Sequence, residues 1–269
     1  MSISWRNRGF LALLCALGLS TPLVMTSPAA AGTTATVRAK APASQALSSP
    51  LYRTGKLPAL GCKAEPISGA ESAKRALKAL GGCLDRAWAK QFKVAGLRFK
   101  PPRQKIITKP VKTTCGSWGE AQGIYCSNSR TLYVLVDSGA LDSSRLFLPS
   151  VLAHEYGHHV QEVARLWDTY REKPKSAELA WSRRYELQAE CLAGAFLSSV
   201  RTSLPFSAGD WSALLADQRH TGDENGDVRD HGKGANIARW MDRGYRAGSP
   251  SACNTFKAPA AHVANTPAA

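Results

Sequence analysis

The chain has 269 residues, of which 35 are Lys or Arg and 20 are Asp or Glu, so its formal net charge is +15. A hydrophobic content of 44% and seven Trp exclude a fully disordered chain, because these side chains need burial. The 22 Gly and 15 Pro exclude a long coiled coil. The length allows one substantial hydrophobic core, or at most two small ones.

Residues 1–31 have the three parts of a secretory signal peptide. Arg6 and Arg8 precede an apolar run over 10–24, and small residues follow up to Ala31. A membrane anchor is the alternative, but the run is shorter than the roughly 20 residues that span a bilayer. We therefore expect a protein that is secreted or associated with the cell envelope, without a stable membrane span after signal cleavage.

Composition divides the rest of the chain into three parts. Residues 32–58 are rich in Ala, Pro, Ser and Thr and predict a flexible linker. Residues 59–256 form one candidate domain, and 257–269 predict a disordered tail.

Six cysteines remain after residue 31, and an even number in an exported chain indicates disulfides. Six cysteines allow 15 pairings. None of them forms a C-x-x-C motif, so a cysteine zinc site has no support. Cys115 and Cys126 bracket a turn-rich loop that a local disulfide would close.

The domain alternates between segments that favour helices and segments that favour strands. A helix is expected over 68–80, capped by Ser68, ended or broken at Gly81 and Gly82, and resuming over 83–90. Apolar and β-branched residues predict strands, and helical periodicity returns after them. The expected strands are 103–111 and 131–136, and the expected later helices are 149–166, 176–200, 208–218 and 233–245. This order predicts an α+β fold, with a small β-sheet followed by a helical half.

The sequence His-Glu-Tyr-Gly-His at 154–158 carries the clearest chemical signal. His154 and His158 are four residues apart, so they share one face of a helix and can bind one Zn²⁺. Glu155 lies beside that metal and can accept a proton from water as general base. Gly157 within a helix indicates the close approach of another element.

A catalytic zinc site needs a third protein ligand, and the next helix offers two carboxylates. Glu186 and Glu190 are also four residues apart, on a helix that is otherwise apolar. We assign Glu186 as the third ligand, and Glu190 as the group that accepts the free N–H of a ligand histidine. The alternative is that both glutamates face solvent or pair with Arg183 and Arg184.

Hydrolysis through a tetrahedral intermediate also needs a donor for the developing oxyanion. His231 is the leading candidate, with Tyr185 and Arg239 as weaker ones, and the alternative is that His231 only begins the last helix. His159 points about 100° away from His158 on the helix, so we expect it to serve packing or a hydrogen bond. Residues 223–227 resemble the start of a calcium loop, but Val228 and Gly234 do not continue that pattern. We therefore expect a turn-rich acidic loop, with a weak calcium site as the alternative.

Other motifs are absent from the sequence. It contains no phosphate-binding or dinucleotide-binding loop and no G-x-S-x-G motif. Basic residues lack the clustered interleaving with aromatic residues that is typical of a single-strand binder, so we expect no nucleic-acid partner. The positive charge suits contact with an anionic cell envelope, or serves only solubility.

Several of these stretches together carry a wider resemblance. They include HEYGHHVQ at 154–161, ELQAECLAG at 186–194, the block 231–256, and the shorter pieces 83–88 and 125–126. In combination they resemble the bacterial neutral zinc metallopeptidase family over essentially 59–256. The resemblance implies a zincin-like fold with zinc on the two histidines and the downstream glutamate, as in thermolysin-like gluzincins.

The resemblance has three further implications. The family's usual pattern is E-x-x-A-D, and this chain has Glu190 where Asp is expected, so its bond must be made from a slightly different position. The likeness pairs Cys191 with Cys253, which leaves the pairs Cys62–Cys83 and Cys115–Cys126. It also gives residues 131–136 the role of an edge strand that aligns extended peptides.

The sequence therefore predicts a secreted zinc-dependent peptidase that acts on peptide or protein substrates. Glu155 serves as general base, and His231 helps to hold the oxyanion. Two alternatives remain: a non-catalytic zinc-fold protein that binds an envelope component, and a hydrolase of cell-wall peptides.

Overall fold

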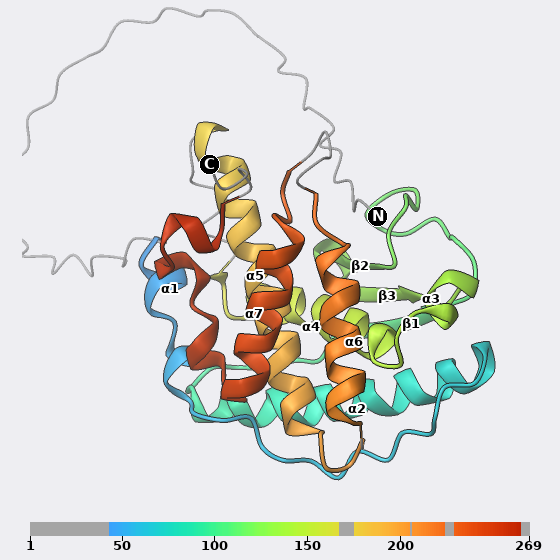
Figure 1. Ribbon diagram of the computed structural model, residues 1–269. Coiled ribbons are helices and arrows are strands. Elements are labelled where there is room, and N and C mark those ends of the chain that lie inside the picture. The colour runs from blue at the N-terminus through green and yellow to red at the C-terminus, as the bar shows by residue number, and fades with distance from the viewer. Residues whose placement is uncertain (1–42, 167–174, 205, 224–228, 265–269) are drawn as a thin grey trace, which may run out of the picture. The chain divides into compact units, whose positions relative to one another are not determined.

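The computed structural model describes residues 43–166, 175–204, 206–223 and 229–264. The expected signal peptide, the first part of the linker and most of the candidate calcium loop lie outside these residues. The described helices and strands confirm an α+β fold with a small sheet and a helical half (Figure 1). Within the described range, no helix is both long and apolar enough to cross a membrane.

The sheet has three strands in the order β1-β3-β2. β3 (Thr131–Leu135) is completely buried, and it pairs in parallel with β1 (Arg103–Ile107) and antiparallel with β2 (Gly123–Cys126). The expectation that 131–136 forms an edge strand is therefore wrong. Its unbroken apolar and β-branched sequence is typical of a central strand, and the edge strand beside α4 is β2.

The first long helix, α2 (Ala70–Val94), runs through both glycines that were expected to end it. Its residue before the first turn is Gly69, so Ser68 does not cap it. Gly81 has a packing role, because the side chain of Gln104 from β1 occupies the position that a Cβ would take. The glycine thus marks a close contact between helix and sheet and not a helix end.

The later helices match the expected ones within a few residues. They are α4 (Phe147–Val163), α5 (Lys175–Ser199), α6 (Ala208–Arg219) and α7 (Gly234–Ala247), and a short helix α3 (Ser138–Asp142) precedes them. Figure 1 shows α5 and α7 side by side, and they share the most extensive contact between elements. A Cβ on Gly157 of α4 would lie 3.0 Å from Cα of Ala189 on α5, which confirms the expected close approach.

The α5–α7 crossing depends on two glycines. A Cβ on Gly194 would collide with the carbonyl oxygen of Met241, and one on Gly244 with that of Cys191. Backbone atoms cannot move aside as a flexible side chain can. The two helices therefore pack backbone to backbone, which fixes the position of α5 and of the glutamates on it.

Replacing Gly194 by Ala is expected to destabilise the protein by about 3 kcal/mol, because overpacking forces backbone shifts. Gly82→Ala is the matched control, since its Cβ would lie 3.6 Å from the end of the Arg86 side chain. Ala in that helix interior should stabilise the protein by about 0.5–1 kcal/mol. Urea unfolding measures both values, and equal stabilities for the two variants would contradict the close crossing.

Three disulfides join the domain, in the pairing that the resemblance implies. They are Cys62–Cys83, Cys115–Cys126 and Cys191–Cys253. The first ties the segment before α2 to that helix. The second closes the loop that leads into β2, and the third fastens α5 to the 3-10 turn Pro250–Cys253.

Parts of the expected linker and tail are packed against the domain. Residues 43–58 contain α1 (Ala43–Ser48) and a 3-10 turn (Pro50–Arg53), and Leu51 and Leu57 are buried. In the tail, the carbonyl of His262 accepts a bond from the Trp240 indole at 2.9 Å, and Val263 is buried. Parts of 43–58 and 257–264 are thus packed where composition predicts a linker and a tail, because composition does not detect a few isolated residues that complete a core.

Candidate metal centre and active site

Two crossing helices bring three potential ligand atoms to one point. On α4, Nε2 of His154 and Nε2 of His158 lie 3.1 Å apart. From α5, Oε2 of Glu186 lies 3.3 Å from the first nitrogen and 3.2 Å from the second. The three side chains could hold a metal ion, and all three residues are those that the sequence predicts.

The spacing of these atoms fits a tetrahedral ion. Bonds of about 2.0–2.1 Å at tetrahedral angles place neighbouring ligand atoms about 3.3 Å apart. Among the described residues, the buried side-chain atoms without a hydrogen-bond partner include Glu186 Oε2, Glu190 Oε2 and His231 Nε2. Buried polar atoms are rarely left unpaired, and a cation at this point would give Glu186 Oε2 a partner.

The second nitrogen of each histidine is also held. Nδ1 of His154 lies 2.9 Å from Oε1 of Glu190, as the sequence predicts, so the longer side chain reaches the ring. Nδ1 of His158 lies 2.9 Å from Oε1 of Gln161, and the Nε2 amide group of Gln161 donates to the carbonyl of Tyr185. Sequence reasoning missed this role of Gln161, although its position three residues after His158 on one helical face could have shown it. Such partners fix the ring orientation for a metal.

Glu155 lies beside the cluster without joining it. Its carboxyl is buried, and burial raises its pKa although His154 and His158 oppose that rise. On the sheet side it touches Gly123 of β2, where a Cβ would lie 2.7 Å from both Cγ and Oε1 of the glutamate. The absence of a side chain at Gly123 therefore leaves room for the buried carboxyl of Glu155.

His231 faces the cluster from the loop before α7. Its Nε2 lies 3.6 Å from Oε2 of Glu186, and its Nδ1 lies 2.7 Å from Oδ1 of Asp230. The carboxylate of Asp223 accepts the backbone N–H groups of His231 and Gly232 at 2.7 and 2.9 Å. Asp223, Asp230 and His231 also satisfy the spacing of a metal site, but these hydrogen bonds already account for their proximity.

The other candidates from the sequence lie apart from this cluster. Tyr185 is buried against Phe256, with ring centroids 5.3 Å apart, and Arg239 is exposed. His159 is buried and lies 2.9 Å from the Tyr125 hydroxyl, and its pKa falls to about 4 because of burial, which fits the expected packing role. The alternative that Glu186 and Glu190 face solvent is wrong, since both are buried.

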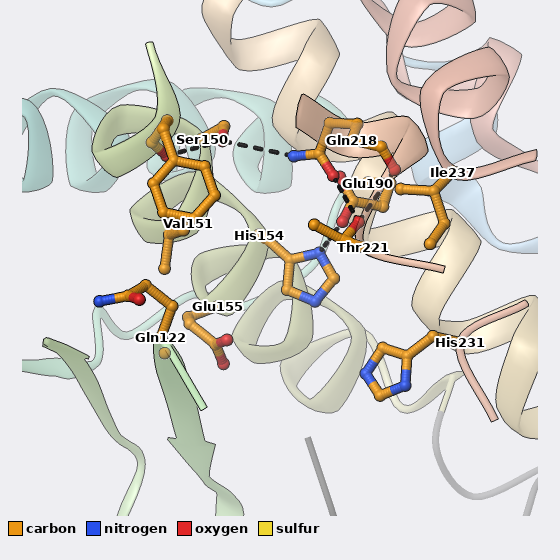
Figure 2. A pocket seen from close by; sticks show the side chains of 12 residues that line it. Gln122, Ser150, Val151, His154, Glu155, Glu190, Gln218, Thr221, His231 and Ile237 are labelled. Carbon is orange, nitrogen blue, oxygen red and sulfur yellow. Dashed lines mark hydrogen bonds and ion pairs between the residues drawn. The ribbon is translucent and has the colours of Figure 1, made fainter. Parts of the chain in front are cut away.

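A cavity of about 90 Å³ opens beside the histidines. Figure 2 shows Glu155 and His231 on opposite sides of His154, with Gln122 near Glu155. The cavity continues between α4, α6 and α7 towards Gln218 and Ile237. A molecule that enters it would meet one candidate ligand, His154, together with the carboxyl of Glu155 and the loop histidine His231.

Without metal, nearby carboxylates raise the pKa of the cluster histidines His154, His158 and His231. Burial disfavours protonation of His154, but Glu190 and Glu186 outweigh burial and raise its pKa well above 6.5. Burial likewise disfavours protonation of His231, and Glu186 and Asp230 nevertheless raise its pKa to about 9. In return, burial of Glu186 is outweighed by His158 and His231, which hold its pKa well below 4.5.

We expect metal-stripped protein to lose stability as the pH rises from 6.5 to about 9. A raised pKa in the folded state contributes stability that is complete below the unfolded value and is lost as pH passes the folded value. Urea unfolding in chelator across this range measures the slope. Asp230→Asn removes one cause of the raised pKa of His231, so it should make stability depend less steeply on pH. A flat profile for the unaltered protein would contradict the charged cluster.

The fold and site define an α+β protein with a candidate metal centre of two histidines and one glutamate. The chain belongs to the family described as "Putative neutral zinc metallopeptidase", whose model matches residues 66–256.

Two relatives show how far the likeness extends. The chain is 29% identical over 192 residues to "Uncharacterized protein YpfJ" of Escherichia coli strain K12, which covers 63% of this chain and 66% of that protein. It is 29% identical over 208 residues to "Uncharacterized protein Rv2575" of Mycobacterium tuberculosis strain H37Rv, which covers 67% and 69%. The chain thus spans slightly under two thirds of the first relative's length. No solved structure matches the chain.

Proposed function

We propose that the protein is an exported zinc peptidase. The convergence of His154, His158 and Glu186 within 3.1–3.3 Å, with the buried Glu155 beside them, carries this proposal. Membership of a zinc metallopeptidase family and the three disulfides support it. His154, His158 and Glu186 would hold the zinc.

Bound zinc would supply Lewis acidity, which polarises the scissile carbonyl and makes a water molecule more acidic. The remaining steps belong to the chain's own residues. Glu155 accepts a proton from the attacking water and delivers it to the leaving amine nitrogen. His231 donates from Nε2 to the developing oxyanion, while Asp230 holds its Nδ1. Glu190 and Gln161 keep the two ligand rings oriented.

A peptide substrate would lie along β2. That strand pairs with β3 on one side, and within the described residues it forms the edge of the sheet on the other. An extended peptide can add to such an edge through backbone hydrogen bonds. Gly123 on this strand touches Glu155, so a peptide there would pass the candidate general base.

Casein hydrolysis by the chain without residues 1–31 tests the function. We expect hydrolysis that a zinc chelator removes and one equivalent of Zn²⁺ restores, since the proposed ligands belong to a single site. Equal hydrolysis before and after zinc removal would contradict the proposal. Zinc-loaded protein that cleaves neither casein nor purified cell-wall peptides would favour a binding role.

A further inference from the structure

The segment from Arg86 to Lys112 is strongly basic. It contains nine Lys or Arg and no Asp or Glu, whereas the whole chain has 35 basic and 20 acidic residues. This segment forms the second half of α2, the connection to β1, β1 itself and the residues that follow it. All nine basic side chains are exposed.

The spacing of these basic residues places several of them on one face of α2 and on one face of β1. Arg86, Lys90 and Lys93 are four and three residues apart, so they share one face of α2. Arg103 and Lys105 alternate along β1 and share one face of that strand. The connection adds Arg98 and Lys100, and the backbone N–H of Leu97 bonds to the carbonyl of Phe92, which folds the connection back onto the helix end.

This positive charge is not neutralised locally. Within the described part of the chain, none of the nine basic side chains forms an ion pair. Asp85 interacts electrostatically with Arg86 but accepts its hydrogen bonds from Tyr156 and Gln104, and Glu162 pairs with Arg130. Lysines on an edge strand prevent strand-to-strand aggregation, which would explain Lys105 but not the three cations on α2.

An exposed apolar side chain stands among these cations. Val94 ends α2 directly after Lys93, and it is 68% exposed. Large exposed apolar side chains are rare among the described residues, the other being Leu179. An apolar tip amid cations is what a peripheral protein presents to a bilayer, where it enters the boundary between headgroups and acyl chains. The exposed Val94 side chain would not strengthen binding to a soluble anionic polymer.

We propose that this surface, which we call the basic face (Arg86, Lys90, Lys93, Val94, Arg98 and Lys100, with β1), docks on an anionic phospholipid bilayer. The cations meet lipid phosphates, and Val94 enters the headgroup layer. β1 and β2 lie at opposite edges of the sheet, and Gly123 of β2 borders the cavity. A protein docked through its basic face therefore keeps the cavity away from the lipid.

Vesicle flotation of the chain without residues 1–31, which retains every described residue, tests this proposal. Vesicles of equal parts phosphatidylglycerol and phosphatidylcholine should bind the protein, and pure phosphatidylcholine should not. Each cation near an anionic surface changes the partition coefficient about five-fold, so the triple variant Lys90→Gln, Lys93→Gln, Arg98→Gln should bind about 100-fold more weakly. Added salt should weaken binding of the unaltered protein.

The matched control removes three exposed cations from other elements: Arg201→Gln, Arg219→Gln and Lys257→Gln. It makes the same change in net charge and should bind anionic vesicles almost as the unaltered protein does. Thermal unfolding of both triple variants verifies that they fold. Equal losses of vesicle binding in the two variants, or no preference for anionic vesicles, would overturn the proposal that the basic face docks on a bilayer.

A second variant separates a bilayer from a soluble polyanion. Val94→Ser should weaken vesicle binding about five-fold by removing buried apolar surface, while binding to inorganic polyphosphate stays unchanged. If Val94→Ser leaves vesicle binding unchanged, and polyphosphate competes fully with vesicles, the partner is an anionic polymer and the bilayer proposal is wrong.

Discussion

Glu155→Gln is expected to lower kcat for peptide hydrolysis by about 10²–10⁴-fold while zinc remains bound. Gln has the shape of Glu but cannot accept a proton, so the variant removes proton transfer alone. The amide fits the same space against Gly123, since only one oxygen is exchanged for nitrogen. Steady-state kinetics at matched zinc content measure the loss.

Glu71→Gln provides the control for this comparison. It makes the same chemical change at an exposed position of α2, where Glu71 forms an ion pair with Lys74. It should leave kcat and zinc content unchanged. Hydrolysis by Glu155→Gln at the rate of this control would contradict the role of Glu155 as general base. Loss of zinc from Glu155→Gln would show instead that Glu155 supports the metal.

Glu186→Gln is expected to lower zinc affinity by more than 100-fold, and Glu190→Gln by about 10–100-fold. The first variant removes a charged ligand, whereas the second only weakens the bond that orients His154. Zinc at 1,000 times its Kd stabilises a folded protein by about 4 kcal/mol, so Glu186→Gln should also lose most of the zinc-dependent rise in Tm. Competition with a chromogenic chelator and thermal unfolding measure the two effects.

Asp230→Asn distinguishes the proposed centre from the neighbouring group of Asp223, Asp230 and His231. Asp230 touches His231 and contacts none of the three proposed ligands directly, so its loss should leave zinc affinity nearly unchanged. Zinc binding that survives Glu186→Gln but is lost in Asp230→Asn would place the metal between Asp223, Asp230 and His231, and would contradict the proposed centre.

Helix geometry explains why the sequence predicts most of the site. Two residues four apart must share a helical face, so the pairs His154–His158 and Glu186–Glu190 are recognisable from their spacing alone. What brings the two faces together is non-local: Gly157 meets Ala189, and this crossing depends on tertiary packing. The family resemblance supplies that missing step. The roles of Asp230 and Gln161 are set by side-chain geometry that spacing does not specify.

The order of the strands could not be predicted in the same way. The apolar sequence of β3 predicts a buried strand, but it does not say which strands lie on its two sides. The sequence does not predict that α2 is continuous, because Gly81 and Gly82 usually weaken helices, whereas here the side chain of Gln104 packs into the space beside Gly81. Leu51 at the start of the domain is buried by residues distant in sequence, which composition does not reveal.

Anomalous diffraction at the zinc edge, from crystals grown with zinc, tests the proposed metal centre most directly. We expect one peak about 2.0–2.2 Å from Nε2 of His154, Nε2 of His158 and a carboxylate oxygen of Glu186. A peak held by Asp223, Asp230 and His231, or no peak in zinc-treated crystals, would contradict the proposed centre.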